Sequence, residues 1–210
     1  MNKKLLLLAT ALLLFTTLAI TVKLSLTDPI NAQAAVIIVA HRTPAQITCA
    51  KIISAIGEWY TYIPIALILL ALPKTRIKSG IPAAVTLATS AALNQIIKRL
   101  LAIPRPALEH LSHANGYGFP SGHVMNGTAY GLILLYLLYK SNAPRVVKLS
   151  FTALGIAFIL SLSCARITLS VHSLTDVIGG YLMGIAVFTA GAMLADHTAR
   201  RVHSTERKDK

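Results

Sequence analysis

Phe119-Pro120-Ser121-Gly122-His123 is followed at once by an apolar run from Val124 to Tyr139. A Pro-Ser-Gly-His sequence that opens a hydrophobic helix brings backbone N–H groups, a hydroxyl and an imidazole to one point. The start of a helix attracts anions, because its first N–H groups have no partner within the helix. The stretch therefore predicts an anion site with a proton donor or nucleophile beside it.

The composition of the 210 residues is that of an integral membrane protein. Hydrophobic residues make up 55% and charged residues 13%, against roughly 25% charged in soluble proteins, and the mean hydropathy is +0.65. The net charge is +13. Basic cytoplasmic loops and attraction to anionic lipid or substrate explain this excess more simply than nucleic acid does. We expect membrane lipids and an anionic substrate as partners, and no nucleic acid.

The apolar runs predict an all-α, polytopic membrane protein with six transmembrane helices in a bundle. The expected spans are residues 5–22, 59–72, 80–97, 124–139, 146–165 and 172–195. The run over residues 59–72 is short for a hydrocarbon core of about 30 Å, so we expect this span to begin earlier and to carry Glu58 at the interface. They form one membrane domain over residues 1–198, and a polar cytoplasmic tail follows over residues 199–210. Residues 23–51 have a mixed composition, which predicts one or two short helices at the membrane surface.

The first apolar run admits a second interpretation as a cleaved secretory signal. Ala32-Gln33-Ala34 has the small-x-small form of a cleavage site. The run over residues 5–22 is, however, longer than the usual apolar core of a signal peptide. Its length favours a first span that is retained.

Two spans carry small or polar residues at helical spacing. Thr86, Ser90 and Asn94 are four residues apart and so share one face of the third span. Gly180 and Gly184 form a small-xxx-small face on the sixth. Both faces are typical of close helix contacts in lipid.

Charge predicts the orientation of the chain in the membrane. Six spans place both termini on one side, where 13 of the 20 Lys and Arg residues fall, against 7 on the other side. The positive-inside rule then places both termini in the cytoplasm and the Pro-Ser-Gly-His segment on the outer face of the inner (plasma) membrane.

Three segments bring unusual residues to that outer face. They carry Lys98 and Arg105-Pro106, then Ser121, Gly122 and His123, then Arg166, His172 and Asp176. A charged residue at the bilayer centre costs roughly 2.5–3.5 kcal/mol. Positions at the span ends avoid most of this cost and gather the charged groups in one layer.

The spacing of these residues suits phosphoryl chemistry. His172 and Asp176 are four apart and so are neighbours on a helix. A carboxylate that accepts from one ring nitrogen fixes the tautomer and makes the other nitrogen a better nucleophile. Other members of the set would surround a phosphoryl group: the cations Lys98, Arg105 and Arg166, the backbone donors of Ser121 and Gly122, and the proton donor His123.

Other interpretations fit each segment alone. The cations would be interfacial anchors, His123 a helix cap, and His172 with Asp176 a structural pair. Taken together these separate interpretations are less convincing, because they do not explain why all three segments fall on one predicted face. A metal site would use His110, His113, His123, His172 and Asp176, but their spacing matches no zinc pattern. We expect neither metal nor cofactor.

At these residues the chain resembles the type-2 phosphatidic acid phosphatase family of membrane lipid phosphatases, which shares its site with the vanadium haloperoxidases. The three family motifs correspond here to Lys98-x6-Arg105-Pro106, Pro120-Ser121-Gly122-His123 and Ala165-Arg166-x5-His172-x3-Asp176. They lie within residues 98–106, 120–123 and 165–176. Ala165 stands where the family pattern has serine.

The resemblance implies a metal-independent phosphatase that acts in two steps. His172 would attack phosphorus and form a phosphohistidine, Asp176 would orient it, and His123 would protonate the leaving group. The phosphate oxygens would be held by Lys98, Arg105, Ser121, Gly122 and Arg166. The lipid substrates expected are undecaprenyl diphosphate, phosphatidylglycerophosphate or phosphatidic acid. Because every charged and nucleophilic position is kept, we expect activity despite Ala165.

Two alternatives remain open. A lipid phosphotransferase would pass the phosphate from His172 to another lipid. The second alternative is a catalytically weak protein that binds or transports lipid phosphates. Ala165 is the only residue that favours it. Transporters more often carry polar residues near mid-span or in broken helices, whereas here these residues lie at span ends.

Overall fold

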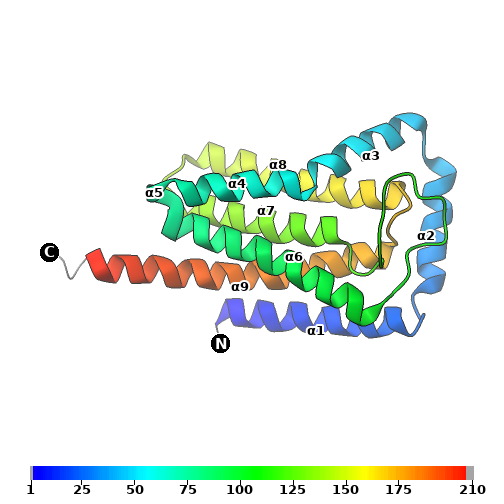
Figure 1. Cartoon of the computed structure of the whole chain (residues 1–210), viewed down its shortest axis with the longest axis horizontal. Helices are drawn as coiled ribbons and strands as arrows, with labels where there is room; N and C mark the ends of the chain where they lie inside the picture. The colour runs from blue at the N-terminus through cyan, green and yellow to red at the C-terminus, as the bar shows by residue number, and fades with distance from the viewer. Residues whose placement is uncertain (1, 207–210) are drawn as a thin grey trace.

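The computed structural model describes residues 2–206, with side chains described up to Arg201. Its helices run side by side along one long axis, and one further helix lies across an end of the bundle (Figure 1). The elements are α1 (Lys3–Lys23), α2 (Asp28–His41), α3 (Pro44–Ile56), α4 (Trp59–Ala71), α5 (Pro73–Thr75), the π-helical turn η1 (Arg76–Gly80), α6 (Ile81–Leu101), α7 (Gly122–Lys140), α8 (Arg145–Thr168) and α9 (Leu174–Glu206). The all-α prediction is confirmed for the described residues.

Five helical stretches within residues 2–206 are long and apolar enough to cross a membrane. They are Lys3–Lys23, Pro44–Ala71, Pro73–Leu101, Arg145–Thr168 and Leu174–Arg201. α7, the predicted fourth span, has 19 residues but is less apolar and is not among them. It packs against α6, α8 and α9, and its side chains at Val124, Met125, Ala129, Tyr130 and Ile133 are buried.

The segment before the predicted second span differs from the expectation. α2 lies across the end of the bundle (Figure 1) and has no buried residue, as expected of a surface helix. α3 instead packs along α8 and continues toward α4. The two helices are separated at Gly57 and Glu58, where Glu58 takes an extended conformation as the N-cap of α4. The second apolar stretch begins before Trp59, as expected, and extends back to Pro44.

The polar face of the third span is confirmed. Thr86, Ser90 and Asn94 are all buried on α6. The helix continues past the predicted end at residue 97, and this extra turn carries Lys98 onto the same buried face. α6 ends at Leu101, where Ala102 adopts a left-handed conformation (φ 49°) and turns the chain into the loop.

The predicted tail boundary at residue 198 does not mark the end of a helix. α9 continues to Glu206, and residues 207–210 of the tail lie outside the described part. Near this end Lys4 pairs with Asp196 at 2.5 Å, and the Tyr136 hydroxyl donates to the same carboxylate at 2.5 Å. These bonds join α1 and α7 to α9 at the end opposite α2 (Figure 1).

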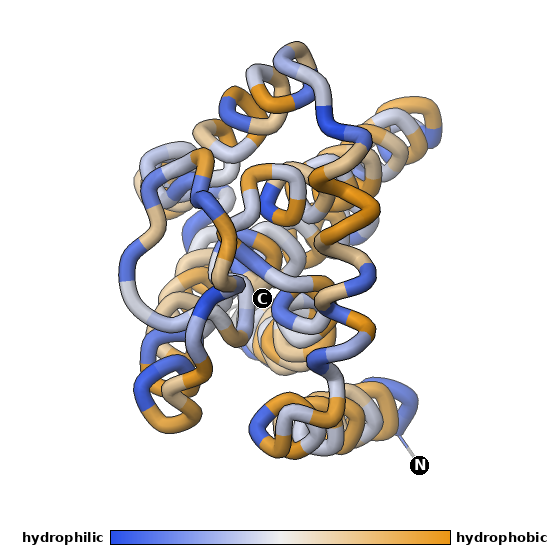
Figure 2. The backbone as a smooth tube through the Cα atoms, turned by 90° about the vertical axis from the view of Figure 1, so that its right-hand side faces the viewer, coloured by the Kyte–Doolittle hydropathy of each residue, from blue (hydrophilic) through white to orange (hydrophobic). Residues whose placement is uncertain are grey.

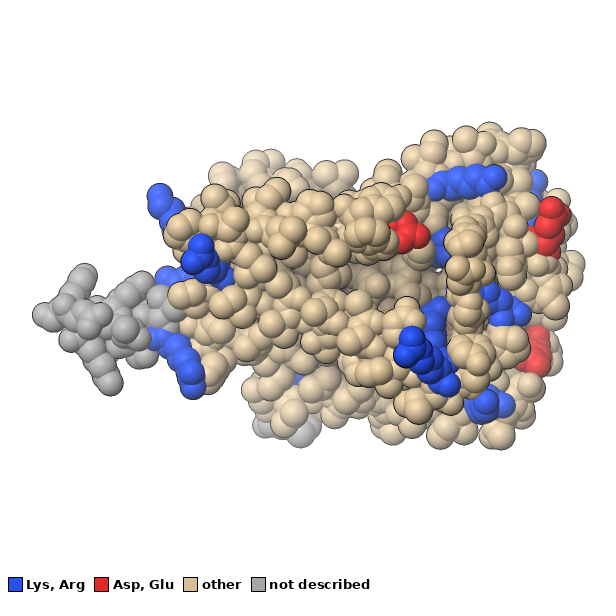
Figure 3. Space-filling view, viewed as in Figure 1, with Lys and Arg blue, Asp and Glu red and all other residues tan. Residues whose placement is uncertain are grey.

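Charged side chains collect at the two ends of the bundle. Figure 3 shows Lys and Arg residues near both ends of one face and a long band of other residues between them. Figure 2 looks onto the end with α2, where hydrophilic segments recur along the connecting loops. This pattern is typical of a bundle whose middle faces lipid and whose ends face water.

Close contact between α7 and α9 depends on the small residues of α9. A Cβ atom at Gly180 would lie 3.0 Å from the Ser121 carbonyl oxygen. At Gly184 it would lie 2.8 Å from the Thr128 Cβ and 2.9 Å from the Met125 carbonyl oxygen. The predicted small-residue face is therefore the face that meets α7.

We expect Gly184→Ala to lower the thermal stability of the purified protein in detergent. The added methyl group meets backbone that cannot move without separating α7 from α9, a type of overpacking that costs about 1–3 kcal/mol. Gly155→Ala is the matched control, because its new Cβ would meet only the end of a leucine side chain, at 3.3 Å. Alanine is otherwise preferred in helices by about 1 kcal/mol. Equal melting temperatures for the two variants would contradict this account of the contact.

Candidate active site

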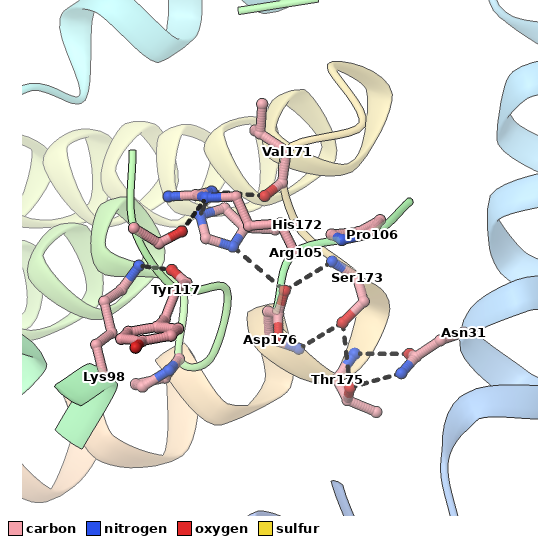
Figure 4. Close-up of polar contacts among 12 residues, drawn as sticks. Asn31, Lys98, Arg105, Pro106, Tyr117, Val171, His172, Ser173, Thr175 and Asp176 are labelled. Carbon is pink, nitrogen blue, oxygen red and sulfur yellow. Dashed lines mark hydrogen bonds and ion pairs between the residues drawn. The ribbon is translucent and has the colours of Figure 1, made fainter. Parts of the chain in front are cut away.

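The three predicted segments meet at the end of the bundle that carries α2. The C-terminal turn of α6 and its loop, the segment before α7, and the turn between α8 and α9 come together there (Figure 1). Figure 4 shows Lys98, Arg105, His172 and Asp176 in one cluster. The three segments therefore lie together at one end of the bundle.

The His172–Asp176 pair forms, but not within a helix. His172 Nδ1 lies 3.3 Å from Asp176 Oδ2, and both side chains are buried. α9 begins only at Leu174, so the prediction that both residues sit on one helix was wrong. Ser173 and Asp176 form a reciprocal cap instead: the Ser173 N–H donates to Asp176 Oδ2 at 2.9 Å, and the Asp176 N–H donates to Ser173 Oγ at 3.3 Å. The cap that starts the helix also fixes the carboxylate beside His172.

α2 is connected to this cap through Asn31. Its side-chain amide donates to Thr175 Oγ1 at 2.9 Å and accepts from the Thr175 N–H at 3.2 Å. Thr175 Oγ1 lies 3.2 Å from Ser173 Oγ, and Figure 4 shows the whole chain of contacts from Asn31 to His172. A helix on the outside of the bundle therefore supports the turn that holds the histidine.

Arg105 defines the tautomer of His172. Its Nη1 donates to the Val171 carbonyl oxygen at 2.6 Å and lies 3.3 Å from His172 Nε2. Guanidinium N–H groups only donate, so Nε2 must be the acceptor and the ring proton sits on Nδ1, facing Asp176. Burial lowers the pKa of His172 to about 3, against the opposing effect of the Asp176 carboxylate. The ring is a neutral base with its lone pair on Nε2.

Contacts with backbone carbonyl oxygens hold Lys98 and the start of α7. Lys98 Nζ donates to the Tyr117 carbonyl oxygen at 2.6 Å, and Asn94 Nδ2 donates to that of Pro120 at 3.1 Å. The Ser121 N–H, predicted to be free for an anion, donates to the Asp176 carbonyl oxygen at 2.9 Å. The helix start is therefore anchored to α9, and the hydroxyl of Ser121 is the group left available.

Three of the predicted site residues carry buried polar atoms without a hydrogen-bond partner. These atoms are Ser121 Oγ, His123 Nε2 and Arg166 Nε. Buried donors are rarely left unsatisfied in folded proteins. Donors of this kind, gathered beside Lys98 and Arg105, suit an anion with several oxygens.

Two supporting residues were missed by the sequence analysis. Arg166 Nη1 donates to Ser54 Oγ of α3. Glu58 Oε1 lies 3.1 Å from His123 Nε2, although the sequence suggested only an interfacial position for this glutamate. Both partners come from the kinked α3–α4 stretch, whose break at Gly57 and Glu58 the apolar pattern did not reveal.

Ala165, the departure from the family pattern, lies in an apolar cluster. It is buried together with Ala50, Leu169 and Val171. Its side chain packs where α8 meets α3. The methyl group fits this apolar contact.

A large cavity lies beside the cluster. It has a volume of about 890 Å³ and runs under α2 and the loop after α6. Its wall includes Arg105, His172 and Asp176 but not Lys98, Ser121, His123 or Arg166. The cavity therefore reaches the His172–Asp176 pair, and the residues with unpartnered donors do not line it.

The alternative metal cluster does not assemble. His110 bonds its own loop, with Nε2 at 3.1 Å from the Pro106 carbonyl oxygen, and is exposed. Among the described residues no group of three or more His, Cys, Asp or Glu side chains is placed to hold a metal ion.

Comparison with known proteins gives consistent matches. The sequence model of the PAP2 superfamily matches residues 79–199. Phosphatidylglycerophosphatase B of Bacillus subtilis (strain 168) is 32% identical over 103 residues, which cover 48% of this chain and 50% of that protein. An undecaprenyl-diphosphatase of Sulfolobus acidocaldarius is 29% identical over 140 residues, covering 63% and 62%. The chain thus matches between half and two thirds of the length of these relatives.

A solved structure shares the fold over most of the chain. The crystal structure of a transmembrane PAP2-type phosphatidylglycerolphosphate phosphatase from Bacillus subtilis superposes with a TM-score of 0.79 at 23% identity, covering 88% of this chain and 93% of that one. The protein is therefore an integral membrane protein built on this helical fold. Because the family match covers more than half of the sequence and contains all three motif segments, the chain belongs to the PAP2 superfamily.

Proposed function

We propose that this chain is an integral-membrane lipid phosphatase that works through a phosphohistidine. The observation that carries the proposal is the state of His172: a buried, neutral imidazole with its proton on Nδ1 toward Asp176 and its Nε2 lone pair facing Arg105. Such a nitrogen is a good nucleophile. It lies beside cations and unpartnered donors that suit a phosphoryl group.

In the first step His172 Nε2 attacks phosphorus, and the bond from phosphorus to the lipid oxygen breaks. The Nδ1 proton stays with the ring, and the Asp176 carboxylate stabilises the positive charge that develops there. Arg105 moves its hydrogen bond from Nε2 to a phosphate oxygen. His123 gives its proton to the leaving oxygen, which departs as a neutral hydroxyl group.

In the second step water attacks the phosphorus of the phosphohistidine. His123, which has lost its proton, removes a proton from this water. The bond from phosphorus to Nε2 breaks, inorganic phosphate leaves, and His172 and His123 return to their first states. No external proton donor is needed over the whole cycle.

The negative charge of the transition state is stabilised by preorganised donors. We assign this role to Lys98, Arg105 and Arg166, with the Ser121 hydroxyl and the Gly122 N–H. Both Lys98 and Arg166 are buried and held by neutral oxygens of Tyr117 and Ser54. These oxygens do not neutralise the positive charges, so both remain available for phosphate.

The substrate class is a lipid phosphomonoester or diphosphate. The names of the relatives support phosphatidylglycerophosphate and undecaprenyl diphosphate, and phosphatidic acid carries the same headgroup chemistry. The phosphate site lies at an end of an apolar bundle, where a lipid headgroup meets a membrane protein.

We place the site on the outer face of the inner (plasma) membrane, with both termini in the cytoplasm. The positive-inside count supports this orientation. It requires α7 to cross the membrane in addition to the five apolar stretches, surrounded by α6, α8 and α9. A helix enclosed by protein needs less apolar surface than one that faces lipid.

Removal of the nucleophile tests the reaction. His172→Asn should lower phosphate release from phosphatidylglycerophosphate micelles by at least about 10³-fold, with EDTA present throughout. Wild type incubated with ³²P-labelled substrate should form an acid-labile ³²P adduct on histidine. His113→Asn is the control, because this exposed histidine lies on the same loop region outside the cluster. Equal activity of wild type and His172→Asn would refute the proposed mechanism.

The ionisation of His172 should depart from that of an ordinary histidine. Its pKa of about 3 lies below the unfolded value of about 6.5, so between these values the unfolded chain binds a proton that the folded chain does not. The resulting contribution to stability is complete above pH 6.5 and is lost as the pH falls toward 3. In ¹⁵N-histidine NMR, the His172 signal, assigned with His172→Asn, should stay neutral from pH 7.5 to 5. A midpoint near 6.5 would contradict this.

The orientation is tested with single cysteines. Cys49 and Cys164 are first replaced by alanine, and then His113→Cys and Asn142→Cys are made separately, at exposed positions on the α6–α7 and α7–α8 loops. A membrane-impermeant maleimide should label position 113 in intact cells and position 142 only after permeabilisation. The reverse pattern would place the site in the cytoplasm.

A further inference from the structure

Glu58 lies at the break between α3 and α4, next to the start of α7. Its backbone is extended (φ −84°, ψ 162°), as expected of an N-cap, but its side chain makes no capping hydrogen bond. The side chain instead reaches His123, with Oε1 3.1 Å from Nε2. The Glu58 side chain is 38% exposed and that of His123 15%, so the pair lies between the interior and the surface.

The geometry of this pair is that of an ion pair without an aligned hydrogen bond. The two atoms are within ion-pair distance, yet His123 Nε2 has no hydrogen-bond partner. The carboxylate therefore lies beside the Nε2–H bond and not in line with it. An arrangement of this kind stabilises an imidazolium by charge and leaves its proton directed elsewhere.

The other charged groups near His123 are cations. Lys98 from α6 and Arg166 from α8 act on the ring electrostatically, and Glu58 is the carboxylate that acts on it with the opposite sign. Burial favours the neutral ring most strongly, the two cations act in the same direction, and Glu58 opposes them. The cations needed to bind phosphate thus oppose the protonated state that the leaving group requires.

We propose that Glu58 is a positioning residue that stabilises the protonated form of His123, with its Nε2–H free to be donated to the leaving oxygen. This rests on the proposed function. In the first step the proton passes from Nε2 to the lipid oxygen as the bond to phosphorus breaks. In the second step the same nitrogen takes a proton from the attacking water, and Glu58 again stabilises the charged ring. The carboxylate itself exchanges no proton.

Two substrates with different leaving groups test this role. Phosphatidic acid expels an alcohol, which needs a proton, whereas p-nitrophenyl phosphate expels a phenolate that leaves without one. Glu58→Gln should lower kcat for phosphatidic acid by about 10²-fold or more and kcat for p-nitrophenyl phosphate by less than about 5-fold. His123→Asn should show the same selectivity, and the double variant should lose no more than His123→Asn alone.

Glu109→Gln is the matched control, because this exposed glutamate lies on the loop between α6 and α7. It should leave both activities unchanged. Equal losses for the two substrates in Glu58→Gln, or no loss for phosphatidic acid, would overturn the proposal.

A measurement without turnover separates this proposal from the proposed function. In ¹⁵N-histidine NMR, the His123 ring should lose its proton at a lower pH in Glu58→Gln than in wild type, by about one pH unit or more. An unchanged midpoint overturns the role of Glu58, whatever the activity. Absence of phosphate release by the wild type would instead refute the phosphatase proposal, while the shift would still establish that Glu58 stabilises the charged form of His123.

Discussion

The arrangement of this site depends on Asp176. One carboxylate oxygen, Oδ2, accepts the Ser173 N–H that begins α9 and faces Nδ1 of His172. The backbone carbonyl oxygen of the same residue accepts the Ser121 N–H at the start of α7. A helix start, the tautomer of a histidine and the junction of two helices thus share one residue. Because Asp176 is held at four points, including its own N–H on Ser173 Oγ, its carboxylate has little freedom to leave the imidazole.

Much of this arrangement could be predicted from the sequence, because membrane spans and motif spacing are strong local signals. The apolar runs predict the helices, and the spacing of Thr86, Ser90 and Asn94 identifies the buried face of α6. Contacts between segments that are far apart in the sequence could not be predicted from these local signals. Glu58 and Ser54 approach His123 and Arg166 only because the chain breaks after α3. The donation of the Ser121 N–H to α9 is likewise a tertiary contact, and no spacing rule reports it.

The electrostatics of the cluster combine two opposing demands. Phosphate binding requires uncompensated cations, and Lys98 and Arg166 are accordingly bonded to neutral oxygens. Acid catalysis requires a charged imidazole among those same cations. The kinked α3–α4 stretch meets both demands, because it brings a neutral hydroxyl to Arg166 and a carboxylate to His123. A straight helix would present side chains at fixed rotations along one axis, whereas the break allows Ser54 and Glu58 to point at different partners.

The modest hydropathy of α7 has a consequence for how the chain enters a bilayer during synthesis. A helix that begins with Gly122 and His123 and carries Asn126 and Thr128 gains less from lipid than its neighbours do. Ser90 of α6 donates to Asn126 Oδ1 at 2.7 Å, so the polar side of α7 finds its partner on the helix made just before it. This favours insertion of α6 and α7 as one hairpin, in which the polar groups are satisfied before lipid surrounds them. α7, the helix that begins at the phosphate site, would then enter the membrane only together with α6.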